Sequence, residues 1–213
     1  MSTWNLDKVE QEIQKAFDND SEVELLEILK MNSFLFHDLY ARKFGIQPCF
    51  AELQFGGKYR CDFAWLNDDS IGPEWVLVEV EKPKLKLFTQ KNEPTAVLNH
   101  ATEQIKSWDR YFKENPLEKK RIFGAVARFR YILVGGLRED WQTEHGIKWR
   151  NYQTQEYKIE IRSIDVFKNA IQVARNRFSD LWSFEENPVC LKHSQLENYW
   201  QEYKYMDTFR KTL

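Results

Sequence analysis

The chain has 213 residues, of which 42% are hydrophobic and 30% charged, and this balance excludes a disordered polypeptide. Because 31 basic and 33 acidic residues give a net charge of −2, any contact with nucleic acid must come from a local basic patch or a metal site. The chain shows no apolar run long enough for a membrane span, no secretory signal and no CxxC pair among its three cysteines. We therefore expect a cytoplasmic protein without a disulfide framework or a cysteine-ligated zinc site.

The N-terminal 45 residues have a helical pattern. Apolar residues between positions 6 and 17 recur at the spacing of one helix face. Ser21 is followed by Glu24 three residues later, which is the spacing of a capping box at the start of a second helix. The pattern also predicts a third, short helix over residues 34–43, before Gly45.

Three β-strands are predicted next, over residues 49–55, 58–66 and 74–81. The pair Gly56-Gly57 separates the first two strands and favours a tight turn, so these strands should be antiparallel neighbours. The third strand is apolar on both faces until its last few residues. A strand buried on both faces belongs in the centre of a sheet.

The rest of the chain is expected to hold two helices, two further strands and a tail. The first helix opens at Pro94 and continues to about Phe112, with one broad apolar face. The remaining elements are strands over 129–136 and 157–163, a helix over 164–178, and an aromatic tail from Ser179 that is helical from about Gln195.

No glycine- and serine-rich linker or internal repeat divides the chain. We expect a helical extension over residues 1–45, one α/β domain over 46–178 and a C-terminal helical tail over 179–213. The tail is rich in aromatic residues that favour either an interface in a homo-oligomer or a cover over an apolar face. These residues are Tyr199, Trp200, Tyr203 and Tyr205.

Three acidic residues cluster around the predicted central strand. Glu79 and Glu81 are two positions apart at its end, so their side chains project from the same face, and Asp62 lies in the preceding strand. Ionisable groups on a buried strand are costly unless they are paired or bind a cation. A divalent ion such as Mg²⁺ or Mn²⁺ would relieve their repulsion and would suit phosphoryl chemistry. The alternative is a solvated strand end that carries surface acids.

An Asp on the second strand, followed by Glu-x-Glu/Lys at the end of the third, is similar to the PD-(D/E)xK nuclease superfamily. The segment VEVEKPKLKLFTQKNEPTAVLNHATEQIKSWDRYFKEN, with His100, Ala101, Gln104 and Trp108 in its helix, resembles the Shedu-type anti-phage nuclease domain. The resemblance covers about residues 25–178. It implies a restriction-endonuclease-like αβββαβ core around a mixed central sheet.

The resemblance also implies an activity and a set of site residues. The expected activity is Mg²⁺- or Mn²⁺-dependent hydrolysis of phosphodiester bonds in DNA, with RNA as an alternative substrate. Asp62 and Glu79 would be the principal metal ligands, and Glu52 would be a further ligand or a more distant acid. Gln104 would lie near the phosphate, and His100, one helical turn earlier, would share its border of the helix.

The sequence departs from the superfamily pattern at position 81, where Glu81 stands in place of the usual lysine. Glu81 could act as a ligand or a general base, whereas Lys82 should point to the opposite face of a regular strand. Other candidate phosphate contacts are Lys84, Lys86, Arg128 and Arg130. The missing lysine leaves open a second interpretation, a catalytically silent nuclease fold that binds nucleic acid or a protein partner.

Overall fold

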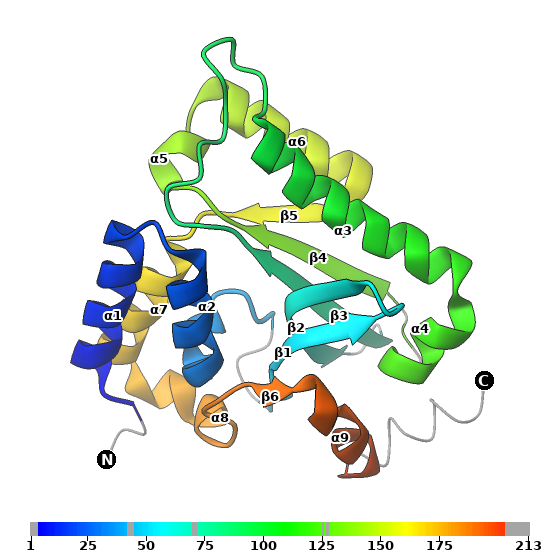
Figure 1. Ribbon diagram of the computed structural model, residues 1–213. Coiled ribbons are helices and arrows are strands. Elements are labelled where there is room, and N and C mark those ends of the chain that lie inside the picture. The colour runs from blue at the N-terminus through cyan, green and yellow to red at the C-terminus, as the bar shows by residue number, and fades with distance from the viewer. Residues whose placement is uncertain (1–3, 42–44, 70–71, 125, 127, 203–213) are drawn as a thin grey trace.

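A six-stranded mixed sheet runs through the centre of the protein in the order β5-β4-β3-β2-β1-β6 (Figure 1). The computed structural model describes residues 4–41, 45–69, 72–124, 126 and 128–202. Strands β1, β2 and β3 are antiparallel neighbours, β4 and β5 continue the sheet parallel to β3, and β6 pairs parallel with β1. Their bounds are β1 Phe50–Phe55, β2 Tyr59–Asp69, β3 Gly72–Val80, β4 Arg128–Val134, β5 Ile159–Arg162 and β6 Leu191–Lys192. The α/β class and the mixed sheet are confirmed.

The turn between β1 and β2 depends on its two glycines. Gly56 and Gly57 have φ angles of 62° and 69°, a left-handed conformation that other residues adopt only at a cost. The turn pairs Phe55 with Tyr59 at the end of an antiparallel hairpin. The predicted hairpin is therefore confirmed.

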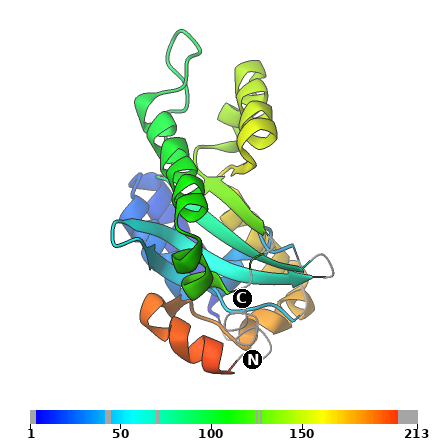
Figure 2. The same ribbon diagram turned by 90° about the vertical axis from the view of Figure 1, so that its right-hand side faces the viewer.

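Strand β3 is central, as its two-faced apolar pattern predicted. Val76, Val78 and Val80 enter one hydrophobic core, whereas Trp75 and Leu77 enter the core on the opposite face. The first core is closed by α1 (Leu6–Asp18), α2 (Glu22–Met31), the 3-10 helix η1 (Ser33–Phe36) and α7 (Val166–Asn176). The second is closed by α3 (Ala96–Glu114), α4 (Pro116–Phe123) and α9 (Leu196–Glu202) (Figure 1, Figure 2).

The N-terminal helices follow the predicted boundaries for α1 and α2, but the third helix does not form as expected. The Ser21 hydroxyl caps α2 by accepting a hydrogen bond from the Glu24 backbone N–H. In place of a helix over 34–43, the structure has only η1, and residues 42–44 lie outside the described part of the chain. Three consecutive residues at 34–36 are fully buried, and a regular helix could not turn all three toward one core.

Two helices between β4 and β5 were not predicted. They are α5 (Arg138–Trp141) and α6 (Glu144–Tyr157), and α6 buries only Gly146 and Gln153, so it lacks a clear apolar face. Helix α6 ends at Tyr157, and Lys158 caps it. Strand β5 is therefore shorter than the predicted strand over 157–163. Similarly, α3 starts at Ala96, capped by Thr95, rather than at Pro94.

The C-terminal part adds η2 (Phe178–Leu181), α8 (Trp182–Glu185), β6, η3 (His193–Gln195) and α9. Helix α9 agrees with the predicted helix from about Gln195, and it buries Tyr199 and Trp200 against the second core. The aromatic residues Tyr203 and Tyr205 lie outside the described residues. Among the helices that the structure describes, none combines the length and apolar character that a membrane crossing needs.

Candidate active site

The structure brings Asp62 and Glu79 together on adjacent strands. The β2–β3 ladder ends at the pair Phe63–Val78, and beyond it the Asp62 Oδ2 atom accepts a hydrogen bond of 2.8 Å from the backbone N–H of Val80. Asp62 and Glu79 are 7% and 8% exposed. Two carboxylates are therefore held side by side, nearly out of water, at the end of the central strand.

A break in the alternation of β1 and β2 accounts for the position of Asp62. Ala51 and Leu53 enter opposite cores although they are two residues apart, and Glu52 between them has a φ angle of 53°. Cys61 and Phe63 on β2 likewise enter opposite cores. Interrupted alternation of this kind, as in a β-bulge, re-aims the side chain at the break, which on β2 is Asp62.

Glu79 has one satisfied oxygen and one without a partner. Its Oε1 atom accepts a hydrogen bond of 2.6 Å from the Gln104 side chain on α3. Its Oε2 atom is buried and has no hydrogen-bond partner in the described structure. A buried carboxylate oxygen without a partner is costly, and a proton or a bound cation would remove the cost.

The carboxylates of this cluster hold their protons more tightly than usual. Burial raises the pKa of Asp62 to about 6 and that of Glu81 to about 7. Burial also raises the pKa of Glu79 well above its ordinary value, and the charges of Asp62 and Glu81 raise it further. Glu22, at the start of α2, adds negative charge to all three acids, whereas Arg60 opposes the rise at Asp62 and Glu79. No feature of the sequence indicated that Glu22 would approach this site.

The donor set suits Mg²⁺ or Mn²⁺ bound by few protein ligands. Within the described residues, no group of three or more His, Cys, Asp and Glu side chains is arranged to hold a metal ion. Mg²⁺ usually keeps several waters and binds through one or two carboxylates together with substrate phosphate. Asp62 and the unpartnered Oε2 of Glu79 fit that requirement.

Glu52 is engaged elsewhere. Its Oε1 lies 3.2 Å from an Arg60 guanidinium nitrogen and its Oε2 lies 3.5 Å from Lys30 Nζ, and the side chain is 47% exposed. The structure therefore places Glu52 in surface ion pairs, from which its charge still raises the pKa of Asp62, whereas the resemblance implied a further metal ligand or a more distant acid.

The lysines that follow β3 contact the α1–α2 connection. Lys82 Nζ lies 3.2 Å from Asp20 Oδ2. The Lys84 backbone N–H donates to Asp20 Oδ1, and Lys84 Nζ donates to the Asp18 carbonyl at 3.0 Å. Lys86 is exposed, and its carbonyl accepts a hydrogen bond from Thr95. Two of the three lysines are thus tied to a segment that lies about sixty residues earlier in the chain.

The two arginines of β4 do not join the carboxylate cluster. Arg128 pairs with Glu74 at 2.5 Å, at the opposite end of β3 from Glu79. Arg130 pairs with Glu160 at 2.5 Å and donates to the Leu39 carbonyl. Both are therefore held in contacts between strands or with the N-terminal segment.

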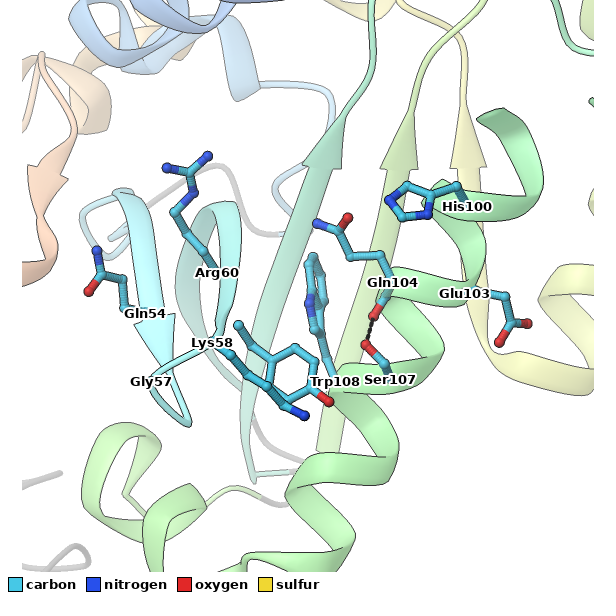
Figure 3. Close-up of a pocket in the computed structure, with 10 residues that line it drawn as sticks. Gln54, Gly57, Lys58, Arg60, His100, Glu103, Gln104, Ser107 and Trp108 are labelled. Carbon is cyan, nitrogen blue, oxygen red and sulfur yellow. Dashed lines mark hydrogen bonds between the residues drawn. The ribbon is translucent and has the colours of Figure 1, made fainter. Parts of the chain in front are cut away.

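A groove with a volume of about 730 Å³ is lined by Gln104, the hydrogen-bond partner of Glu79, although the carboxylates themselves are not among its lining residues. Residues of the β1–β2 hairpin, including Lys58 and Arg60, line one side, and residues of α3 line the other (Figure 3). His100 and Gln104 both face this groove from successive turns of α3, and His100 is exposed. Sequence reasoning identified His100 and Gln104 but missed Lys58 and Arg60, although basic residues just after a glycine turn are a usable signal.

The family model for the C-terminal region of the Shedu protein SduA matches residues 7–167. No curated protein in the comparison matches the chain. The matched residues comprise the N-terminal helices, the hairpin, β3, α3, β4, β5 and the start of α7. Because the match extends over most of the sequence, the chain belongs to the Shedu SduA C-terminal family.

Proposed function

We propose that the protein is a metal-dependent endonuclease that hydrolyses phosphodiester bonds in DNA, and that it acts in anti-phage defence, as its Shedu family membership suggests. The observation that carries the proposal is the pair of buried carboxylates, Asp62 and Glu79. One of their oxygens has no partner among the described residues, and Gln104 links the pair to an open groove. A structural acid would be expected to have a cation or a full set of donors in the protein itself.

Asp62 and Glu79 would hold Mg²⁺ or Mn²⁺, which when bound polarises the scissile phosphate and activates water. Gln104 fixes the orientation of Glu79 through its 2.6 Å hydrogen bond. Glu81, whose pKa is raised to about 7 mainly by burial, is suited to accept a proton from the attacking water near neutral pH.

A second candidate function is a catalytically silent module that binds nucleic acid or a protein. The observation that favours it is the absence of the expected lysine, since Glu81 occupies its position and Lys82 pairs with Asp20. Such a module would not depend on the two carboxylates for its partner.

The deciding experiment is the nicking of supercoiled plasmid in Mg²⁺ or Mn²⁺ by the wild type and by Asp62→Ala and Glu79→Ala. Loss of a metal ligand removes several kcal/mol of charge stabilisation, so each variant should lose about 10³-fold in rate. Glu74→Gln is the matched control, because Glu74 is a buried acid on the same strand as Glu79. It should retain cleavage.

Equal cleavage by all four proteins would show that the activity is a contaminant or that the site is misplaced. If the folded wild type cleaves neither DNA nor RNA, calorimetric titration with Mg²⁺ and a binding assay follow. A silent module should keep its partner in Asp62→Ala.

A further inference from the structure

The groove beside the carboxylates has two walls from segments far apart in the sequence. The Gly56-Gly57 turn carries Lys58, Tyr59 and Arg60 along one wall, and α3 forms the other (Figure 3). At about 730 Å³ it lies within the size range of ligand sites and can hold a short stretch of a nucleic-acid strand. Its lining mixes polar and apolar groups, and most of the lining residues are exposed, so it differs from an enclosed apolar pocket for a small molecule.

The basic side chains of the hairpin wall are available to a ligand. Lys58 is exposed and makes no ion pair with any residue that the structure describes, and its Nζ lies 4.9 Å from the centre of the Tyr59 ring. Arg60 is 54% exposed, and its pair with Glu52 at 3.2 Å lies at the surface. An exposed pair contributes little to stability, and the guanidinium group keeps further N–H donors for a phosphate.

The acidic residue of the helix wall is already compensated. Glu103 lies 2.9 Å from Lys106 Nζ and 3.6 Å from an Arg110 nitrogen. The hydrogen bond from Lys106 lowers the pKa of Glu103, so this carboxylate stays ionised within its own cluster. Glu52, the partner of Arg60, is likewise shared with a second cation, because it lies 3.5 Å from Lys30 Nζ. The positive charge left over along the groove is therefore that of Lys58 and part of that of Arg60.

Gln104 connects the groove to the candidate metal site. It lines the groove and donates its hydrogen bond to Glu79, so a chain lying in the groove passes next to the carboxylates. Asp62, Glu79 and Glu81 would repel a phosphate backbone, and the chain as a whole has no basic excess. Local cations beside the site are needed to hold that backbone.

We propose that this groove binds the sugar–phosphate backbone of the DNA strand to be cut, with Lys58 and Arg60 as its phosphate contacts. The proposal deepens and rests on the proposed endonuclease function, because it names the path by which substrate reaches the carboxylates. Lys58 and Arg60 thus take over the role of phosphate contacts that was predicted from the sequence for Arg128 and Arg130. The guanidinium groups of those two arginines pair with Glu74 and Glu160.

The test measures the affinity for a fluorescent DNA duplex by anisotropy, in Ca²⁺ to prevent cleavage, at several salt concentrations. The variants are Lys58→Gln, Arg60→Gln and the double variant. Each lost phosphate contact should weaken binding about tenfold at 0.1 M salt. It should also make the negative slope of log K against log salt shallower by about 0.9, or by about 1.8 for the double variant. Arg60→Lys keeps the charge and should restore most of the slope.

Lys91→Gln and Arg138→Gln are the matched controls, since both residues are exposed and lie outside the groove. They should leave affinity and slope unchanged, and melting temperatures should show that every variant is folded. If the double variant binds DNA with the wild-type slope, or if the wild type binds only RNA or no nucleic acid, the proposed path is wrong.

The two proposals can fail separately. DNA binding that depends on Lys58 and Arg60, without cleavage in Mg²⁺ or Mn²⁺, would contradict the endonuclease and leave the groove assignment standing. Plasmid cleavage that depends on Asp62 and Glu79, with unchanged binding by the double variant, would contradict the groove assignment alone.

Discussion

The two ends of strand β3 each bury a glutamate, and the two glutamates have different surroundings. Glu74 is 7% exposed, and its oxygens are bound by Arg128 at 2.5 Å and by Asn67 at 3.1 Å. Glu79 is 8% exposed, but within the part of the chain that the structure describes it receives one hydrogen bond, from Gln104, and its second oxygen has no partner. Burial alone therefore does not distinguish a structural acid from a functional one.

The difference lies in the neighbouring charges. At the start of β3 a cation pairs directly with the buried acid, whereas at the end of β3 more acids surround it and Arg60 offsets their charge only in part. A protein has no stability reason to gather buried carboxylates without a cation. The second arrangement is typical of a site that binds an external cation, and it separates Glu79 from Glu74 in four measurable ways.

The largest expected effect on stability is at Glu74. Glu74→Ala removes the carboxylate that pairs with Arg128 and accepts a hydrogen bond from Asn67, and it should lower the free energy of unfolding by about 3 kcal/mol, near the lower end for a buried pair. The lower end applies because the Arg128 side chain is 35% exposed. Glu79→Gln should leave stability unchanged or higher, because it removes an uncompensated charge. Urea unfolding at pH 8 measures the free energy of unfolding of both variants. A large loss of stability in Glu79→Gln would mean that Glu79, like Glu74, has a structural role.

The next effect is a pH dependence that Mg²⁺ reverses. The pKa values of Asp62 and Glu81 are raised to about 6 and about 7, so the folded protein binds more protons than the unfolded chain between about pH 4 and pH 7. Without metal, these groups should therefore lower stability as the pH rises through that window. Mg²⁺ binds the deprotonated acids, so at 100 times its Kd it should add about 2.7 kcal/mol at pH 8 and little at pH 5.

Unfolding curves at several pH values, with and without Mg²⁺, measure this effect. Other groups titrate in the same range, so the quantity to compare is the difference between the wild type and Glu79→Gln. Equal stabilisation of the two proteins by Mg²⁺ would place the ion elsewhere.

A smaller effect is expected when the support of Glu79 is removed. Gln104→Ala loses the 2.6 Å hydrogen bond and should lower the cleavage rate about 10- to 100-fold, the usual range for a group that orients a metal ligand. Gln90→Ala changes an exposed glutamine in the loop before α3 and serves as the control. Unchanged metal affinity and cleavage in Gln104→Ala would mean that the hydrogen bond from Gln104 is not required to orient Glu79.

The smallest effect is expected at Lys82. Its pair with Asp20 joins side chains that are 43% and 28% exposed, and exposed pairs contribute less than about 1 kcal/mol. Lys82→Ala should therefore change stability by less than that and cleavage by less than about tenfold. A loss of cleavage as large as that of Glu79→Ala would instead make Lys82 a catalytic residue. Plasmid nicking and thermal unfolding decide between these outcomes.

Much of the framework could be predicted because it depends on local patterns. The hairpin follows from the two glycines at 56 and 57, and the central position of β3 follows from apolar residues on both of its faces. Helix α6 could not be predicted, since it buries only Gly146 and Gln153 and so shows no amphipathic pattern. The 3-10 helix at 33–36 was missed because its aromatic run resembles part of a longer helix.

The sequence by itself determined the hairpin, the central strand, the family and the proximity of Asp62 to Glu79, because each depends on a local pattern, a motif or neighbouring strands. Only the tertiary structure decided which charges meet. It placed Glu22 near the acids and Lys82 against Asp20. It also paired Arg130 with Glu160, across thirty residues of sequence. The periodicity of one segment reports which face is buried, whereas the partner of a charged side chain depends on how distant segments pack.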